Sequence, residues 1–357
     1  MSVPLFDLKR VLNPASESLQ QAYLDCFEHG KFISGPEVSL FEKSFSNKLG
    51  GGHCIGVSSG TDALQAIFMA LDLEPGTEVI VPSFTFIASA SSIIRAGLKP
   101  VFADLEGGSF HLSLKTIKKA WTDNTGAVLF VHLFGEPENL DEINKFCNDK
   151  NAYLIEDCAQ SYGSTAGRVG VASAYSFFPA KNLGCLGDGG AVVTGDPIFA
   201  EKIRTIRTHG CARKYHYNLL GGNFRLDTIQ AAFLNVLLRE SDAWIEKRKN
   251  NARYYNNELS TVSDLVLPRD CDGHAWNQYT IRLEKRDDLK KFLDKNNIGN
   301  AVYYPIPLHH SECIFGKSKN LPETDLRCKE VLSIPIYPGL TTEERAMVVS
   351  KIKEFFK

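Results

Sequence analysis

Short apolar runs alternate with stretches of helical spacing over the first two thirds of the chain. The runs predict five strands, at His53–Val57, Glu78–Pro82, Lys99–Asp104, Ala127–His132 and Tyr153–Asp157. Between them, apolar residues recur at helical spacing over Asp62–Leu71, Leu114–Trp121 and Asn139–Lys150. Strands rich in Val, Ile and Phe that alternate with helices indicate βαβ units and a mostly parallel sheet.

The rhythm changes after residue 157. Two more strands are expected at Ala174–Phe178 and Ala191–Thr194, followed by a helix from Pro197 to about Arg207. A long apolar face then predicts a helix from near Asp227, past Trp244, towards Leu259, and its length suits a connector between domains.

The last third of the chain predicts a small α+β domain. It contains a strand at Trp276–Leu283 and helices at Asp287–Asn296, Leu326–Leu332 and Thr342–Phe356. We therefore expect an α/β fold with a large cofactor-binding domain over residues 1–240, its mostly parallel sheet flanked by helices, and a small C-terminal domain over residues 241–357.

The composition narrows the class of protein. The chain has 357 residues, of which 43% are hydrophobic, and this is enough to bury sizeable cores. Its 40 Lys and Arg nearly balance 42 Asp and Glu, whereas proteins that bind nucleic acid usually carry a basic excess. No apolar run reaches about 18 residues, and residues 1–10 lack the apolar stretch of a secretory signal. We expect a cytoplasmic protein that binds neither nucleic acid nor membrane.

The nine cysteines are scattered without a CxxC pair or a repeating spacing. This scatter and the odd number indicate reduced thiols, and they give no support for a metal centre.

The segment from Ser58 to Leu64 is a candidate anion site. It follows a predicted strand and opens a helix, where backbone N–H groups and the helix dipole favour an anion. Gly60 allows close approach of the backbone, and Thr61 adds a hydroxyl donor. An ordinary helix N-cap is the alternative, because Ser, Thr and Asp all cap helices.

Two further residues can carry chemistry. Asp157 stands at the end of an apolar strand, where ligands of open α/β sheets lie, and a carboxylate there can hold a protonated ring nitrogen. Lys181 is a charged residue among apolar and small residues in the sequence. Desolvation in such surroundings lowers the pKa of a lysine and favours the neutral amine that acts as a nucleophile. A solvated acid and a surface lysine are the alternatives for each residue taken alone.

The order of these three features is more specific than any one of them. An anion site, a strand-end carboxylate and a desolvated lysine match the phosphate, ring nitrogen and aldehyde of pyridoxal 5'-phosphate. The sequence therefore predicts this cofactor.

Several motifs in the same order resemble a known family. They are Ser59–Leu64, Val81–Phe86, Glu156–Gln160, Ser176–Asn182, Gly187–Ala191, Gly222–Asp227 and Tyr304–His309. The chain is similar to the DegT/DnrJ/EryC1/StrS family of nucleotide-sugar aminotransferases, which depend on pyridoxal phosphate and have the aspartate aminotransferase fold.

The resemblance implies a role for each matching site residue. Lys181 forms the Schiff base, Asp157 pairs with the pyridine nitrogen, and Gln160 lies near the ring oxygen. Gly60, Thr61 and Ser176 bind the cofactor phosphate, and Phe86 stacks on the ring. Asn223 reaches the cofactor phosphate of the other subunit of a homodimer. His309 lies near the substrate pocket.

The resemblance also implies a reaction. Glutamate is the expected amino donor, and a nucleotide-linked keto sugar is the expected acceptor. Relatives that dehydrate the sugar carry His in place of Lys181, so Lys181 favours transamination. Tyr215–Tyr217 and Gly222–Asp227 look closer to relatives that aminate C3 than to those that aminate C4, whereas Tyr303 departs from the His of many relatives.

Two alternative functions, and one open question about a basic stretch, remain at this stage. A non-catalytic regulatory or assembly protein could keep the fold, although it need not keep both Lys181 and Asp157. A nicotinamide-dependent oxidoreductase ranks last, because no GxGxxG opens a helix after a predicted strand. The basic stretch Arg204–Tyr217, with Arg204, Arg207, Arg213 and Lys214, is either a contact for a nucleotide diphosphate or a solvated loop.

Overall fold

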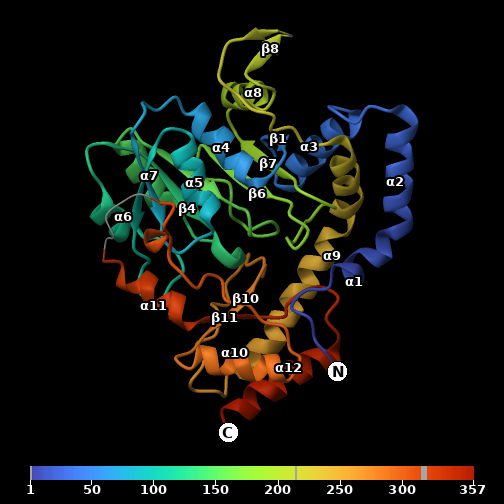
Figure 1. Cartoon of the computed structure of the whole chain (residues 1–357), viewed down its shortest axis with the longest axis vertical. Coiled ribbons are helices and arrows are strands. Elements are labelled where there is room, and N and C mark those ends of the chain that lie inside the picture. The colour runs from blue at the N-terminus through green and yellow to red at the C-terminus, as the bar shows by residue number, and fades with distance from the viewer. Residues whose placement is uncertain (1, 214, 315–319) are drawn as a thin grey trace.

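A seven-stranded sheet forms the centre of the first two thirds of the chain (Figure 1). A computed structural model describes residues 2–213, 215–314 and 320–357. The strands of this sheet are β1 (His53–Val57), β2 (Glu78–Pro82), β3 (Lys99–Ala103), β4 (Thr125–Val131), β5 (Tyr153–Asp157), β6 (Ala172–Ser176) and β7 (Gly190–Thr194). Their order is β1-β7-β6-β5-β4-β2-β3; β7 runs antiparallel to β1 and β6, and the other neighbouring pairs of this sheet are parallel. The predicted mostly parallel sheet is confirmed.

Helices cover both faces of this sheet because side chains alternate along its buried strands. Val79 and Val81 of β2 pack in one core with α4 (Gly60–Ala70), α5 (Ile87–Arg95) and α8 (Pro197–Ile206). Ile80, between them, packs in another core with α6 (Leu114–Ala120) and α7 (Asp141–Asp149). The helices α1 (Leu8–Leu12), α2 (Ser16–His29) and α3 (Pro36–Lys48) precede the sheet in the chain, and α3 packs against β1.

A second, smaller sheet of two antiparallel strands organises the C-terminal part. Its strands are β10 (Tyr279–Arg282) and β11 (Val331–Ile334), and its helices are α10 (Arg286–Lys295), α11 (Pro322–Glu330) and α12 (Thr342–Phe355). The 32-residue helix α9 (Thr228–Leu259) runs from the large sheet into this part (Figure 1).

The N-terminal segment also joins the C-terminal part. Val3 N–H donates to Asn297 O at 2.9 Å, and Gly299 N–H donates to Val3 O at 2.7 Å. The boundary expected at residue 240 lies inside α9, so the division into residues 1–240 and 241–357 stays a prediction. Among the described helices, none combines the length and apolar character that crossing a membrane requires.

Two predicted C-terminal elements differ from the structure. The helix expected at Leu326–Leu332 ends at Glu330, and the chain continues as β11, because Val331 and Leu332 are buried opposite β10. The strand expected from Trp276 begins at Tyr279, because Trp276 has a φ of +51°, which a strand does not accommodate. A short hairpin of β8 (Cys211–Arg213) and β9 (His216–Tyr217) projects beyond α8 (Figure 1).

Candidate active site

A cavity of about 460 Å³ opens at the carboxyl ends of the parallel strands. Seven of the predicted site residues line it, namely Gly60, Thr61, Phe86, Asp157, Gln160, Ser176 and Lys181. They come from four separate segments of the chain, so the fold brings them together. The size suits a small-molecule cofactor or substrate, for which pockets of about 300–1,000 Å³ are typical.

The N-terminus of α4 forms one wall of the cavity. Ser59 caps the helix, since its Oγ accepts the N–H of Asp62 at 3.0 Å, and the capping alternative therefore holds for Ser59. The first N–H groups of a helix have no acceptor within it, and Gly60 and Thr61 at these positions line the cavity. A Cβ added to Gly60 would lie 2.7 Å from Ser176 Cβ. The glycine therefore keeps helix and strand close enough to form a narrow anion cradle.

Lys181 lies in the turn that follows β6. Its N–H donates to Phe178 O at 2.8 Å, and its side chain lines the cavity. Burial lowers the pKa of Lys181 to about 8, although the nearby carboxyl of Asp157 acts in the opposite direction. The predicted desolvation of this lysine is thus present, and it makes the neutral amine far more available at neutral pH than in an ordinary lysine.

Asp157 is the last residue of β5 and is almost completely buried. Its Oδ2 accepts the hydroxyl of Ser89 at 2.8 Å, and its Oδ1 accepts the N–H of Ala159 at 3.1 Å. Burial raises the pKa of Asp157, while these two donors and the charge of Lys181 act against that rise. A cationic partner in the cavity, such as a protonated ring nitrogen, would complete the neutralisation of this carboxylate.

Aromatic side chains form another side of the cavity. Phe86 is 55% exposed, and its ring centroid lies 6.1 Å from that of Tyr304. An exposed ring at the cavity edge is available for stacking on a flat ligand. Gln160 Oε1 accepts the N–H of Phe134 at 2.6 Å, which fixes the orientation of its amide beside the cavity.

The two other predicted site residues do not line this cavity within one chain. Asn223 is exposed and pairs with Thr208 in an isolated antiparallel bridge. His309 is buried, and its Nδ1 lies 2.7 Å from Ser83 Oγ while its N–H donates to the same hydroxyl at 3.0 Å. Their predicted contacts with a second subunit and with substrate stay predictions.

Arg204 and Arg207, at the end of α8, make ion pairs within the chain, whereas Arg213 of the same basic stretch is exposed. Arg207 Nη1 lies 2.5 Å from Glu42 Oε1, and Arg204 Nη1 lies 3.4 Å from Glu42 Oε2. These ion pairs connect the end of α8 to α3, while the side chain of Arg204 stays 32% exposed. The expected contact of this stretch with a nucleotide diphosphate stays a prediction. Lys214 lies outside the described residues.

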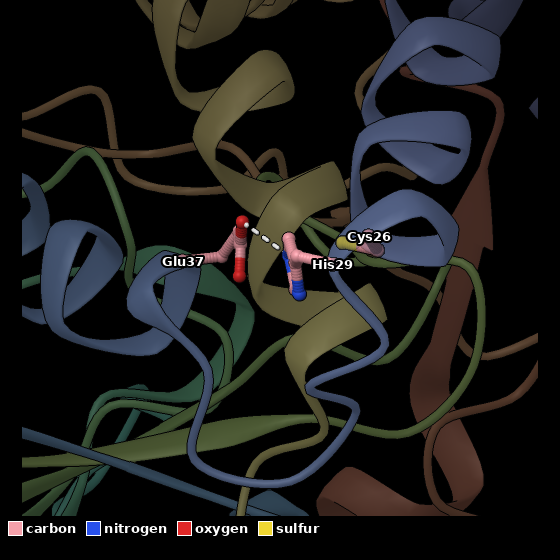
Figure 2. A group of neighbouring side chains, drawn as sticks. All are labelled: Cys26, His29 and Glu37. Atoms are coloured by element: carbon pink, nitrogen blue, oxygen red, sulfur yellow. Dashed lines mark hydrogen bonds and ion pairs between the residues drawn. The ribbon is translucent and has the colours of Figure 1, made fainter.

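A group of metal-ligand residue types lies away from the cavity, between α2 and α3 (Figure 2). His29 Nδ1 accepts the N–H of Lys31 at 3.0 Å, and its Nε2 lies 3.1 Å from Glu37 Oε1. An imidazole whose Nδ1 accepts a hydrogen bond carries its proton on Nε2, so it donates to Glu37 and has no lone pair left for a metal ion. This group joins two helices, with the buried thiol of Cys26 beside it.

Sequence reasoning missed several cavity residues. His132 follows β4, beside the end of β5, and the rule that ligands lie beyond strand ends could have found it. Ser89 stands one helical turn after Thr85, but nothing in the sequence indicates its bond to Asp157. Asn277 and Tyr304 belong to the C-terminal part of the chain, and only the tertiary structure brings them to the cavity.

Comparison with known proteins identifies the family. The DegT/DnrJ/EryC1/StrS aminotransferase family matches residues 14–353. The chain is 39% identical to a pleiotropic regulatory protein of Geobacillus stearothermophilus, over 100% of this chain and 99% of that protein. It is 36% identical to dTDP-3-amino-3,4,6-trideoxy-alpha-D-glucose transaminase of Streptomyces venezuelae, over 99% and 96%. A crystal structure of S. venezuelae DesV with a ketimine intermediate matches with a TM-score of 0.96 at 35% identity, over 100% and 99%.

The chain belongs to the DegT/DnrJ/EryC1/StrS aminotransferase family. It is therefore an enzyme of the pyridoxal phosphate-dependent sugar aminotransferases, and the predicted family, fold, enzyme class and cofactor are confirmed.

Proposed function

We propose that the protein transfers an amino group from glutamate to C3 of a nucleotide-linked keto sugar, with pyridoxal 5'-phosphate bound in the 460 Å³ cavity. The observation that carries this proposal is the meeting, in one cavity, of a desolvated lysine, a buried carboxylate and a helix N-terminus. These groups complement the aldehyde, ring nitrogen and phosphate of the cofactor.

Each cavity residue has a definite task in this proposal. Gly60, Thr61 and Ser176 bind the phosphate through N–H and hydroxyl groups, and Phe86 stacks on the ring. The ionised carboxylate of Asp157 accepts the N–H of the protonated ring nitrogen. Its two oxygens each already accept one hydrogen bond, which fixes the plane of the carboxylate. The amide nitrogen of Gln160 is left to donate to the ring oxygen, because its oxygen is occupied by Phe134.

Lys181 performs the proton transfers. The bound cofactor supplies an electron sink that lets an amino group leave one substrate and join another. Lys181 Nζ, once free of the cofactor, removes the proton from the substrate carbon that bears nitrogen and returns it at the cofactor carbon that was the aldehyde. The keto sugar half of the cycle uses the same amine in reverse. A pKa of about 8 keeps both forms of this amine accessible near neutral pH.

The C3 position rests on similarity. The S. venezuelae relative is named for a 3-amino sugar, and the motifs around Tyr217 and Asn223 favour the same position. Both motifs lie in or after the exposed β8–β9 hairpin. Glutamate as donor rests on the family resemblance alone.

A homodimer with shared active sites is part of the proposal. Large apolar side chains are exposed on α2 and just after it, with Phe27 at 65%, Leu24 at 54% and Ile33 at 50%. Such a concentration of exposed apolar surface is typical of an interface. Ile33 also bridges Asp227, four residues beyond Asn223, so this surface adjoins the residue predicted to reach the partner's cofactor.

A regulatory function is the second candidate, because one relative is named as a pleiotropic regulatory protein. Regulation alone does not require a lysine of lowered pKa beside a buried carboxylate. The retention of both groups in an open cavity supports catalysis.

Borohydride reduction followed by peptide mapping tests the proposal directly. Reduction of the purified yellow protein should fix the cofactor to the peptide that contains Lys181. A glutamate assay with synthetic 3-keto and 4-keto sugar nucleotides then tests donor and position. An adduct on another lysine would remove the assignment of Lys181, and turnover of the 4-keto sugar alone would remove the C3 assignment.

A further inference from the structure

The carboxylate of Asp157 is reached by a chain of two buried hydroxyls. Ser89, on the first turn of α5, donates from Oγ to Asp157 Oδ2 at 2.8 Å. Thr85 Oγ1 lies 3.0 Å from Ser89 Oγ. Ser89 and Thr85 are 1% and 2% exposed. A hydrogen bond to a charged group is electrostatically stronger in such a buried place than in water.

The carboxylate of Asp157 determines which hydroxyl donates and which accepts in these two hydrogen bonds. An ionised carboxylate can only accept hydrogen bonds, so the hydroxyl proton of Ser89 is directed at Asp157. The oxygen of Ser89 is then left as an acceptor, and Thr85 donates to it. Both hydroxyl dipoles therefore stabilise negative charge on Asp157 and neither stabilises its protonated form.

The other groups around Asp157 show why such support matters. Burial opposes its ionisation, while Lys181 and His132 favour it through their charges. Lys181, however, carries no ammonium charge when its amine is neutral, and its amine is no longer free when it is bonded to the cofactor. Tyr304 also faces this carboxylate and is disfavoured as an anion by it. Ser89, Thr85 and the N–H of Ala159 are therefore the donors that stay constant through a catalytic cycle.

We propose that Ser89, supported by Thr85, is a positioning residue that keeps Asp157 ionised and aimed at the ring nitrogen of the cofactor. This inference rests on the proposed function, because it assigns a second layer to the same site. Thr85 and Phe86 both lie in the short segment between β2 and α5. This segment therefore supports Ser89 and also carries the residue proposed to stack on the ring.

Binding of pyridoxamine phosphate to the apoprotein tests this proposal without turnover. The ligand is not bonded to Lys181, and a ¹⁵N label in its ring reports protonation of the ring nitrogen by NMR. In Ser89→Ala we expect roughly tenfold weaker binding, because Asp157 without this donor is more basic and takes a share of the proton from the ring. The protonated fraction of the ring nitrogen should therefore be smaller than in the wild type at the same pH. Ser89→Thr keeps the hydroxyl and should restore both values.

Ser92→Ala is the matched control. Ser92 is a buried serine of the same helix, but its hydroxyl bonds to Ala88 O and not to Asp157. A Ser89→Ala protein that matches Ser92→Ala in affinity and in ring protonation would overturn the inference. If Ser89→Ala does not fold, Thr85→Val replaces it. A smaller shift in the same direction then supports the inference, and no shift overturns it. A wild-type protein that does not bind pyridoxamine phosphate at all would instead remove the proposed function.

Discussion

At the scale of single residues, the site depends on how burial changes two ionisable groups in opposite ways. A lysine amine and a carboxylate both lose hydration in the cavity, which lowers the pKa of Lys181 and raises that of Asp157. The sequence indicated the lysine's apolar neighbourhood correctly. It could not show the hydroxyl donor that opposes the rise at Asp157, because Ser89 lies 68 residues away in the chain. The backbone donor, the N–H of Ala159, is local to the segment.

The first prediction concerns the capture of the cofactor by Lys181. With its pKa at about 8, roughly one amine in ten is neutral at pH 7, against about one in 3,000 at the ordinary value of 10.5. The rate at which apoprotein combines with pyridoxal phosphate should therefore rise with pH and level off above about 8. Stopped-flow absorbance measures this rate, and Lys181→Ala should lack the phase. A rate that still rises at the pH of an ordinary lysine would contradict the lowered pKa.

The second prediction concerns acid stability and Glu156. Burial penalises this carboxylate, but His132 and the N–H groups of Gly170 and Val169 outweigh the penalty and hold its pKa below the usual value. A lowered pKa means that the stabilisation is present above pH 4.5 and is lost as pH falls below it. Glu156→Gln should lower the free energy of unfolding by about 2–4 kcal/mol at neutral pH and flatten its decline in acid.

Chemical denaturation of apoprotein at several pH values measures this difference. Glu142→Gln, on the surface of α7, is a suitable control, since no comparable network surrounds it among the described residues. Parallel acid profiles for wild type and Glu156→Gln would contradict the role assigned to Glu156.

At the scale of elements, the helix N-terminus at α4 is the clearest example of local sequence and tertiary contact acting together. Ser59 caps the helix from within the segment, and this could be predicted. The close approach of Gly60 to Ser176 could not, because it depends on how β6 lies beside α4. By contrast, β11 was missed because its four residues follow a helix without a turn residue between them, so the pattern alone favours continuation of the helix.

The third prediction tests this approach. Gly60→Ala places a Cβ 2.7 Å from Ser176 Cβ, so helix or strand must shift and widen the phosphate cradle. We expect affinity for pyridoxal phosphate to fall by about tenfold or more, with a smaller effect on folding. Equilibrium dialysis or fluorescence titration measures this affinity. Gly195→Ala is the control, because no atom lies within 4 Å of its added Cβ, and an equal loss in both variants would argue against the cradle.

At the scale of the whole molecule, a single chain brings seven predicted residues to one cavity and leaves Asn223 on an exposed edge. The C-terminal part adds Asn277 and Tyr304 to the same cavity. The backbone N–H of Asn277 donates to Phe134 O at 2.9 Å, which ties this residue to the large-sheet part of the chain. The cavity is thus built from both parts of the chain.

The fourth prediction tests whether Asn223 acts across a dimer. We expect Asn223→Ala and Lys181→Ala each to be nearly inactive as pure proteins. In a mixed dimer, one site then combines the intact Lys181 of one subunit with the intact Asn223 of the other. Coexpression should therefore restore activity, to roughly a quarter of wild type for random pairing. Activity no greater than the mean of the two parents would contradict a contact between subunits.

The sequence by itself determined the class of the protein. Alternating apolar runs fixed the order of strands and helices, and three short segments contained the groups that pyridoxal phosphate requires, because covalent and ionic chemistry needs particular residue types. The tertiary structure alone decided which groups surround those residues, from Ser89 behind Asp157 to Tyr304 beside Phe86. The reason is physical: burial and neighbouring dipoles set the charge of a site, and both depend on contacts between segments that are far apart in the chain.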